Sequence, residues 1–210
     1  MIAGVKRFEF VNITTPIGDV CMILFLVRHP RTVYGYGMCY GATDVPVAPA
    51  VMDESIACVN SILPSDAWSW PWFASPLSRA ADLARGLGAD PVLDARIREL
   101  DFGHWELTPW NDLPIADIKK WGDDFVNTPV PGGESFFDLQ TRVVSFATDL
   151  LASGDEQAVV VTHAGPIRAL TAWALGLPLA NSFRLEVGFA GVLQLSLGTD
   201  PFTNRLLALR

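Results

Sequence analysis

The chain has 210 residues, half of them hydrophobic, which is enough for one sizeable core and short for two. Its net charge of −8 and isoelectric point near 4.7 argue against nucleic acid or a membrane surface as a partner. An anionic ligand would therefore have to be held by a local cluster of arginines. The three scattered cysteines suggest neither disulfides nor zinc, and a cytoplasmic location is expected.

Residues 1–21 have less pattern than the rest of the chain and are expected to form an N-terminal extension, with one domain over residues 22–210. A basic pair, Lys6 and Arg7, precedes an apolar stretch that is soon interrupted by "NITTPIGD". This arrangement does not fit a secretory signal, and no run reaches the length of a transmembrane helix.

Strands and helices alternate along the rest of the chain. The apolar runs "VCMILFLV", "WPWFAS" and "QAVVVT" predict strands, the first and last of them buried on both faces. Helices are predicted over residues 51–63, 79–87, 136–152 and 167–175. The segments "GVLQLSL" and "NRLLALR" flank a turn and predict an antiparallel edge hairpin. The pattern indicates a three-layer α/β/α sandwich with a mostly parallel central sheet and an antiparallel edge strand.

Three predicted strand ends carry the same kind of chemistry. Arg28 and His29 follow the first strand, Arg79 lies in "SPLSR" after the second, and His163 follows the third in "VTHAGPIR". Ligands of such sheets bind outside the carboxyl ends of the strands. One histidine at a strand end is as often structural as functional. Two of the chain's three histidines at such positions, together with Arg79, predict a shared site.

The motifs "VRHP", "SPLSRA", "LRELDFGHWE", "PGGES" and "VTHAGPIRAL" resemble, in their order and spacing, the histidine phosphatase superfamily in its phosphoglycerate mutase-like branch. The resemblance covers roughly residues 22–198. It implies a metal-independent phosphomonoesterase without a cofactor. His29 would be the nucleophile that becomes phosphorylated, Arg28, Arg79 and His163 would hold the phosphoryl group, and Glu99 would be the acid and base.

These residue types suit phosphoryl transfer on chemical grounds as well. The charge on the transferred group is stabilised by fixed cations, and arginine makes bidentate contacts while staying charged. A neutral imidazole can attack phosphorus and form a covalent intermediate. Glu106 competes with Glu99 as the acid, and Glu99 is preferred because "RELDFG" matches the family's motif. Glu134 could line the pocket or cap the helix that starts near Ser135.

Several positions depart from the family's pattern: Pro30 and Arg31 after the histidine, Gly35 in place of an asparagine, and Leu83 in place of a threonine. A catalytically silent protein that binds phosphoryl ligands or regulates a partner therefore stays open. For Arg168 a structural ion pair is expected, and for His104 a solvated loop position.

Two further features of the sequence indicate the reaction and its substrate. Only residues 107–130 separate the acid-bearing motif from "PGGES", where mutases of the family carry a long insertion, so hydrolysis is favoured over mutase activity. The stretch "CYG…DVP" resembles that of α-ribazole phosphatases, which act in cobalamin assembly, and implies substrate contacts from Tyr40 and Gly41. The runner-up is a broad-specificity phosphatase for small molecules. A small phosphorylated metabolite is the expected partner, and a homodimer is one assembly that the sequence allows.

Overall fold

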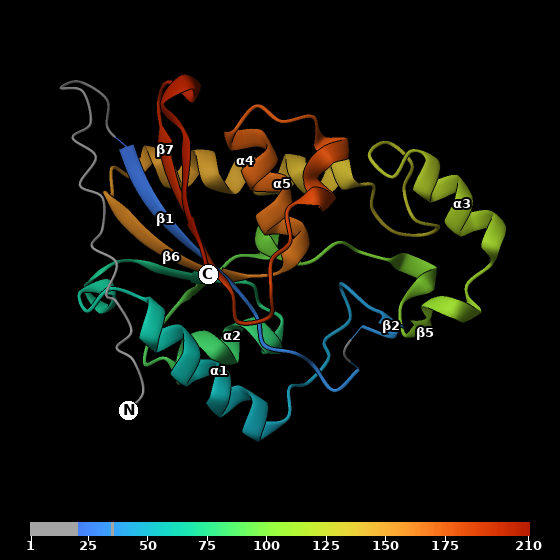
Figure 1. Ribbon diagram of the computed structural model, residues 1–210, viewed down its shortest axis with the longest axis horizontal. Helices are drawn as coiled ribbons and strands as arrows, with labels where there is room; N and C mark the ends of the chain where they lie inside the picture. Colours follow the sequence, from blue (N-terminus) through green and yellow to red (C-terminus); the bar gives the residue numbers. More distant parts are fainter. Residues whose placement is uncertain (1–20, 35) are drawn as a thin grey trace, which may run out of the picture.

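The computed structural model describes residues 21–34 and 36–210 (Figure 1). The expected extension lies outside these residues except for its last member, and so does Gly35. The strands are β1 (Cys21–Arg28), β2 (Met38–Cys39), β3 (Trp72–Ala74), β4 (Val92–Leu93), β5 (Thr108–Pro109), β6 (Gln157–Thr162), β7 (Val192–Gly198) and β8 (Arg205–Leu209). The α-helices are α1 (Pro49–Ile62), α2 (Ser78–Gly86), α3 (Ile115–Asp123), α4 (Phe136–Ala152) and α5 (Ala164–Ala174).

Six strands form one sheet in the order β4-β3-β6-β1-β7-β8. The first four of these run parallel to one another, whereas β7 is antiparallel to β1 and β8 is antiparallel to β7. The predicted mostly parallel sheet with an antiparallel edge strand is confirmed. Within the predicted hairpin only β8 is an edge strand, because β7 pairs with β1; β4 forms the opposite edge of the sheet.

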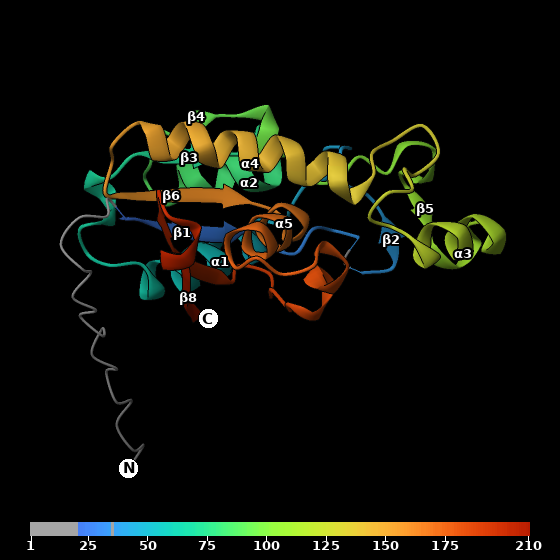
Figure 2. The same ribbon diagram turned by 90° about the horizontal axis from the view of Figure 1, so that it is seen from above.

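Strand β1 is apolar on both faces and lies in the middle of the sheet. Its Leu24 and Leu26 join the core that α4 and α5 cover, and its Phe25 and Val27 join the core beneath α1 and α2. Successive side chains of a strand point to opposite faces, so a run that is apolar at every position needs a layer on each side. Figures 1 and 2 show these two helical layers.

Two helices begin where the site is formed. A capping box starts α4, in which Ser135 and Asp138 exchange hydrogen bonds between side chain and backbone. Helix α5 begins at Ala164, three residues before the predicted start. Pro166 does not prevent this, because an N–H group in the first turn has no partner within the helix. The early start places the first turn of α5 directly after His163.

A small unit projects beyond the carboxyl ends of β1 and β6, and Figure 2 shows it around β5 and α3. Its strands β2 and β5 pair antiparallel. Its core consists of Cys39, Trp105, Leu113 and Val130, with Trp110 and Trp121 packed against them. We call this unit the cap. Its tryptophans pack against each other and against Phe102.

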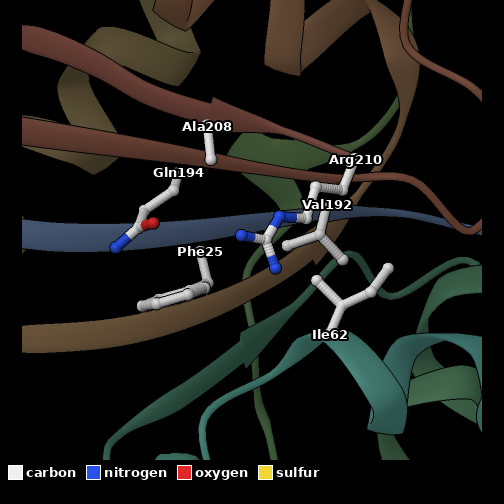
Figure 3. Close-up of a pocket in the computed structure, with 6 residues that line it drawn as sticks. All are labelled: Phe25, Ile62, Val192, Gln194, Ala208 and Arg210. Atoms are coloured by element: carbon white, nitrogen blue, oxygen red, sulfur yellow. The ribbon is translucent and has the colours of Figure 1, made fainter. Parts of the chain in front are cut away.

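A shallow pocket lies on the sheet face next to α1, under the β7–β8 hairpin (Figure 3). It is lined by Phe25, Ile62, Val192, Gln194, Ala208 and Arg210. None of the residues that the sequence marks for catalysis contributes to it. In the described part of the chain, no helix combines the length and the apolar character needed to cross a bilayer.

Candidate active site

The sheet topology brings the expected residues together. His29 follows β1, His163 follows β6, and Arg79 lies in the first turn of α2 just after β3. These three strands are neighbours and parallel, so their carboxyl ends meet at one edge of the sheet. The ring centroids of His29 and His163 lie 4.9 Å apart, and all three side chains are buried.

His29 presents a nucleophilic nitrogen. Its Nδ1 lies 2.6 Å from the carbonyl oxygen of Pro30, which can only accept a hydrogen bond, so the ring proton is on Nδ1 and Nε2 has a lone pair. Burial, together with the charges of Arg79 and Arg28, holds the pKa of His29 well below its usual value of 6.5. The ring is therefore neutral at pH 7.

His163 is neutral with the opposite tautomer. Its Nδ1 accepts a hydrogen bond from Nε of Arg79 at 3.3 Å, so the ring proton must be on Nε2, which donates to Oγ of Ser75 at 2.8 Å. Burial, followed by the charge of Arg79, lowers the pKa of His163 well below 6.5. Both ring nitrogens thus have partners within the protein, and a contact of His163 with a phosphoryl group stays a prediction.

Arg28 and Arg79 are cations whose hydrogen bonds go to neutral acceptors. Arg79 donates from Nη1 to the carbonyl oxygen of Thr43 at 2.8 Å and from Nη2 to that of Gly41 at 2.5 Å. Arg28 donates from Nη1 to the carbonyl oxygen of Val187 at 2.6 Å, and its buried Nε has no partner among residues 21–34 and 36–210. Neither forms an ion pair with a carboxylate in the described residues. Burial lowers the pKa of both side chains.

Positive charge that lacks an ion pair is unfavourable in a largely buried place unless an anion uses it. The arrangement therefore favours a ligand with several negatively charged oxygens, as a phosphoryl group has. The described residues contain no group of three or more His, Cys, Asp or Glu side chains arranged to hold a metal ion.

Glu99 lies next to the first turn of α5, which begins directly after His163. Its carboxylate accepts hydrogen bonds from the backbone N–H groups of Gly165, in the first turn of α5, at 3.1 and 3.2 Å, and of Leu100 at 3.0 Å. Its charge is also the largest influence that opposes the effect of burial on the pKa of Arg28 and of Arg79. If the two arginines bind a phosphoryl group as expected, a carboxyl group beside them is placed to exchange protons with a leaving group or with water.

The sequence profile described as "Histidine phosphatase superfamily (branch 1)" matches residues 24–209. The chain belongs to the histidine phosphatase superfamily. The resemblance drawn from the motifs is thereby confirmed, and so is the assignment as a phosphatase.

Individual relatives of this histidine phosphatase carry different names. A protein of Hydrogenobacter thermophilus named "Putative phosphoserine phosphatase 2" is 28% identical over 188 residues, which cover 86% of this chain and 92% of that protein. The glucosyl-3-phosphoglycerate phosphatase of Mycolicibacterium vanbaalenii is 33% identical over 176 residues, covering 75% and 76%. A structure from Escherichia coli, called a "putative alpha-ribazole-5'-P phosphatase", is similar with a TM-score of 0.77 at 23% identity, covering 89% and 95%. At that identity the similarity shows the fold alone.

Two of the residues expected to bind substrate in this histidine phosphatase have other contacts. The N–H group of Gly41 donates to the carboxylate of Glu106, and a Cβ at Gly41 would overlap the carbonyl oxygen of Leu100. Gly41 is therefore required for close packing of the backbone. Glu134 pairs with Arg142 at 2.8 Å and accepts from the N–H group of Asp101 at 3.0 Å.

Of the two roles considered for Glu134, the structure excludes the cap of α4, and the role of lining the pocket stays a prediction. It does not cap α4, since Ser135 does, and its carboxylate is engaged by the ion pair. Arg168 also differs from the expected structural ion pair: it donates to the carbonyl oxygen of Leu185 at 2.9 Å, and its guanidinium lies 5.1 Å from the ring centroid of Phe183. His104 is exposed, as expected.

Tyr40 stays a candidate for substrate contact. Its ring lies 5.4 Å from the guanidinium carbon of Arg79, and its hydroxyl accepts from Thr32 at 2.8 Å. A second aromatic residue beside the site, Phe189, has its ring 3.8 Å from the guanidinium carbon of Arg28 and 5.7 Å from the ring of His29. The ring of Tyr36 lies 5.0 Å from that of Phe189.

Sequence reasoning missed Phe189, Ser75 and Arg142. Ser75 stands in "SPLSR", where its place directly after a strand was a usable signal. Phe189 lies in "VGFAG", whose turn depends on Ala190 in the left-handed region at a φ of 53°. No local pattern marks a loop that reaches His29 from the other end of the chain.

Proposed function

We propose that the chain hydrolyses phosphomonoesters through a phosphohistidine at His29, without a metal ion. The observation that carries this proposal is a pair of arginines, Arg79 buried and Arg28 partly buried, that form no ion pair among the described residues and lie beside a neutral histidine with a lone pair on Nε2. The remaining possibility of a silent binding protein rests on the departures at Pro30, Arg31 and Leu83, but none of these removes a titratable group of the site.

The proposed reaction consists of two displacements at phosphorus. In the first, Nε2 of His29 attacks phosphorus, the bond from phosphorus to the ester oxygen breaks, and Glu99 gives its proton to the departing alkoxide. In the second, water attacks the phosphohistidine, Glu99 takes the proton, and the P–N bond breaks to release inorganic phosphate. Arg28 and Arg79 hold the phosphoryl oxygens, on which the charge of the transition state lies, and His163 joins them by donating from Nε2 to a phosphoryl oxygen in place of Ser75.

We favour hydrolysis over phosphoglycerate mutase activity, which ranks behind both of the phosphatase candidates named below. Residues 107–130 form only β5, a short 3-10 helix (Trp110–Asp112), α3 and a connecting loop. The cap built from them is small, and its aromatic side chains pack among themselves. A small cap favours access of water to the phosphohistidine.

For the substrate we propose α-ribazole 5′-phosphate, with a broad-specificity phosphatase for small molecules as the second candidate. Support comes from the "CYG…DVP" resemblance and from Tyr36 and Phe189, whose rings could pack against a planar base near His29. The name of the Escherichia coli protein agrees with it, whereas those of the two other relatives point to different phosphate esters.

Trapping the intermediate tests the reaction. Substrate carrying radiolabelled phosphate is mixed with enzyme and quenched in alkaline denaturant, and the label is located by peptide mapping. We expect label on His29 in the wild type, none in His29→Ala, and normal labelling in the control His104→Ala, since His104 is the chain's third histidine and is exposed. Absence of turnover of an aryl phosphate by the wild type, or label retained by His29→Ala, would refute the proposal.

A further inference from the structure

Glu106 holds a loop through its backbone. Both carboxylate oxygens accept from the N–H group of Gly41 at 3.0 Å, and the N–H groups of Ala42 and Thr43 donate at 2.9 and 3.2 Å. A fourth N–H group, that of Phe102, donates at 3.0 Å. One carboxylate therefore satisfies four backbone donors, three of them from consecutive residues.

The same loop directs its carbonyl oxygens at Arg79. The peptide unit between Gly41 and Ala42 has its N–H group on Glu106 and its carbonyl oxygen on Nη2 of Arg79. A peptide unit is planar, and in the trans form its N–H and C=O bonds point in opposite directions. Fixing the N–H end therefore fixes the direction of the carbonyl that orients the guanidinium.

The loop is also tied to the helix that carries Arg79. Oδ1 of Asp44 accepts from the N–H group and the hydroxyl of Ser78, at 2.8 and 2.9 Å, and Ser78 is the residue before Arg79. The guanidinium and the loop that orients it are thus anchored together.

The fork of Arg79 still has donors for a ligand. Of the five N–H bonds of a guanidinium, one goes to His163 and two go to the carbonyls of Gly41 and Thr43, which leaves one on each terminal nitrogen. Two such bonds match two oxygens of a phosphoryl group. Because its partners are a neutral imidazole and carbonyl oxygens, Arg79 is oriented while its charge is not neutralised.

We propose that Glu106 is a positioning residue, which shapes loop 41–44 so that Arg79 is preorganised for the phosphoryl group. This inference rests on the proposed function, and it assigns to Glu106 a task different from proton transfer. The interaction of Arg79 with phosphoryl oxygens should weaken when Glu106 is changed, whatever the leaving group is.

Glu106→Gln tests this, because the amide places an NH2 group against the backbone donors. We expect the inhibition constant for inorganic phosphate to rise on the order of tenfold, with kcat/KM for p-nitrophenyl phosphate and for an alkyl phosphate falling by similar factors. In an Arg79→Lys background, Glu106→Gln should change these constants by less than about twofold, since the fork is already lost. The exposed Glu156→Gln, the same chemical change at the start of β6, should match the wild type.

The outcomes separate the two proposals. If the wild type forms no phosphohistidine, the proposed function fails. If the wild type reacts as proposed but Glu106→Gln leaves phosphate inhibition unchanged, has its full effect in Arg79→Lys, or harms only the alkyl phosphate, the positioning role is wrong and the proposed function stands. Should Glu106→Gln not fold, Asp44→Ala loosens the other end of the loop. It should raise the phosphate inhibition constant at least about threefold, and an unchanged constant would overturn the inference.

Discussion

Arg142 of α4 donates from Nη2 to the carbonyl oxygen of Glu99 at 2.9 Å. From Nη1 it also reaches the carbonyl oxygens of Arg96 and Arg98, at 2.7 Å each, and it pairs with Glu134. The segment that leads into Glu99 has no helix or strand of its own beyond a 3-10 turn (Ala95–Ile97). The position of the proposed acid is therefore set by a side chain about forty residues away in the sequence.

Replacing Arg142 should damage both stability and catalysis. Arg142→Ala leaves three carbonyl groups and the Glu134 carboxylate without this partner, which should cost about 3 kcal/mol of the free energy of unfolding. Activity in the folded fraction should fall mainly for alkyl phosphates, because Glu99 is displaced. Urea titration and kinetics at a temperature below the transition give the two values. An unchanged ratio of alkyl to aryl turnover would show that Arg142 supports only the fold.

Glu99→Gln should show selectivity for the leaving group. A departing alkoxide needs a proton, whereas nitrophenolate needs little, so kcat should fall by about 100-fold or more for an alkyl phosphate and far less for p-nitrophenyl phosphate. The same pair of substrates applied to Glu106→Gln serves as the comparison. If that variant has the selective loss instead, Glu106 is the acid.

The pH dependence of stability should reflect the two buried histidines. Their folded-state pKa values are lowered, so between about pH 6.5 and those values the unfolded chain binds protons that the folded chain does not. The free energy of unfolding should then decrease as the pH falls below 6.5, by up to about 1.4 kcal/mol per pH unit for each histidine. His29→Asn should flatten this slope. An equal slope in the wild type and in His29→Asn would contradict the assignment.

The lowered pKa of His29 should also determine how activity depends on pH. Neutral His29 is the nucleophile, and its lowered pKa keeps it neutral in weak acid. We therefore expect the acidic limb of kcat/KM that belongs to His29 to lie below pH 6.5. An acidic limb that is centred at or above pH 6.5, and that no substitution other than one at His29 removes, would contradict the lowered pKa of His29.

Substrate preference can be measured directly. An α-ribazole phosphatase should prefer α-ribazole 5′-phosphate over nucleoside and sugar phosphates by at least on the order of tenfold in kcat/KM, or about 1.4 kcal/mol. Phe189→Ala and Tyr40→Ala should each reduce this preference more than they reduce turnover of p-nitrophenyl phosphate. A flat profile in the wild type would favour the broad-specificity alternative and leave the phosphatase assignment in place.

Removal of divalent metal should have no effect. The proposed mechanism uses Arg28, Arg79 and His163 to stabilise the phosphoryl charge, so an excess of chelator should leave kcat unchanged. Inhibition that is reversed by one particular divalent ion would count against the mechanism.

The fold and the central part of the site could be predicted because they depend on strands. Apolar runs and the polar residues at their ends place His29 and His163 at one edge of the sheet, and this placement does not depend on the conformation of the loops. The functions of Glu106 and Glu134 could not be read in this way. Each carboxylate is occupied by backbone N–H groups or by an arginine that loops and α4 bring in from elsewhere, and sequence spacing contains no information on such contacts.

Gly41 illustrates the same limit. The motif around it indicates substrate contact, but the close approach of Leu100 explains why glycine is needed there. The sequence pattern also predicts the start of α5 too late, at Ile167, whereas the helix begins at Ala164. That difference matters for function, since the early turn supplies the N–H group of Gly165 to Glu99.

The strand that positions His29 has hydrogen-bonded neighbours on both edges and a packed layer on both faces. Such a strand has no route to open by itself, so the amides of Leu26 and Val27 should exchange with deuterium only when the whole domain unfolds. The N–H groups of loop 41–43 should exchange much earlier, because only a carboxylate at the edge of the cap protects them. Hydrogen exchange would thus show that the backbone before His29 opens only with the whole domain. The loop that orients Arg79 would open far more readily.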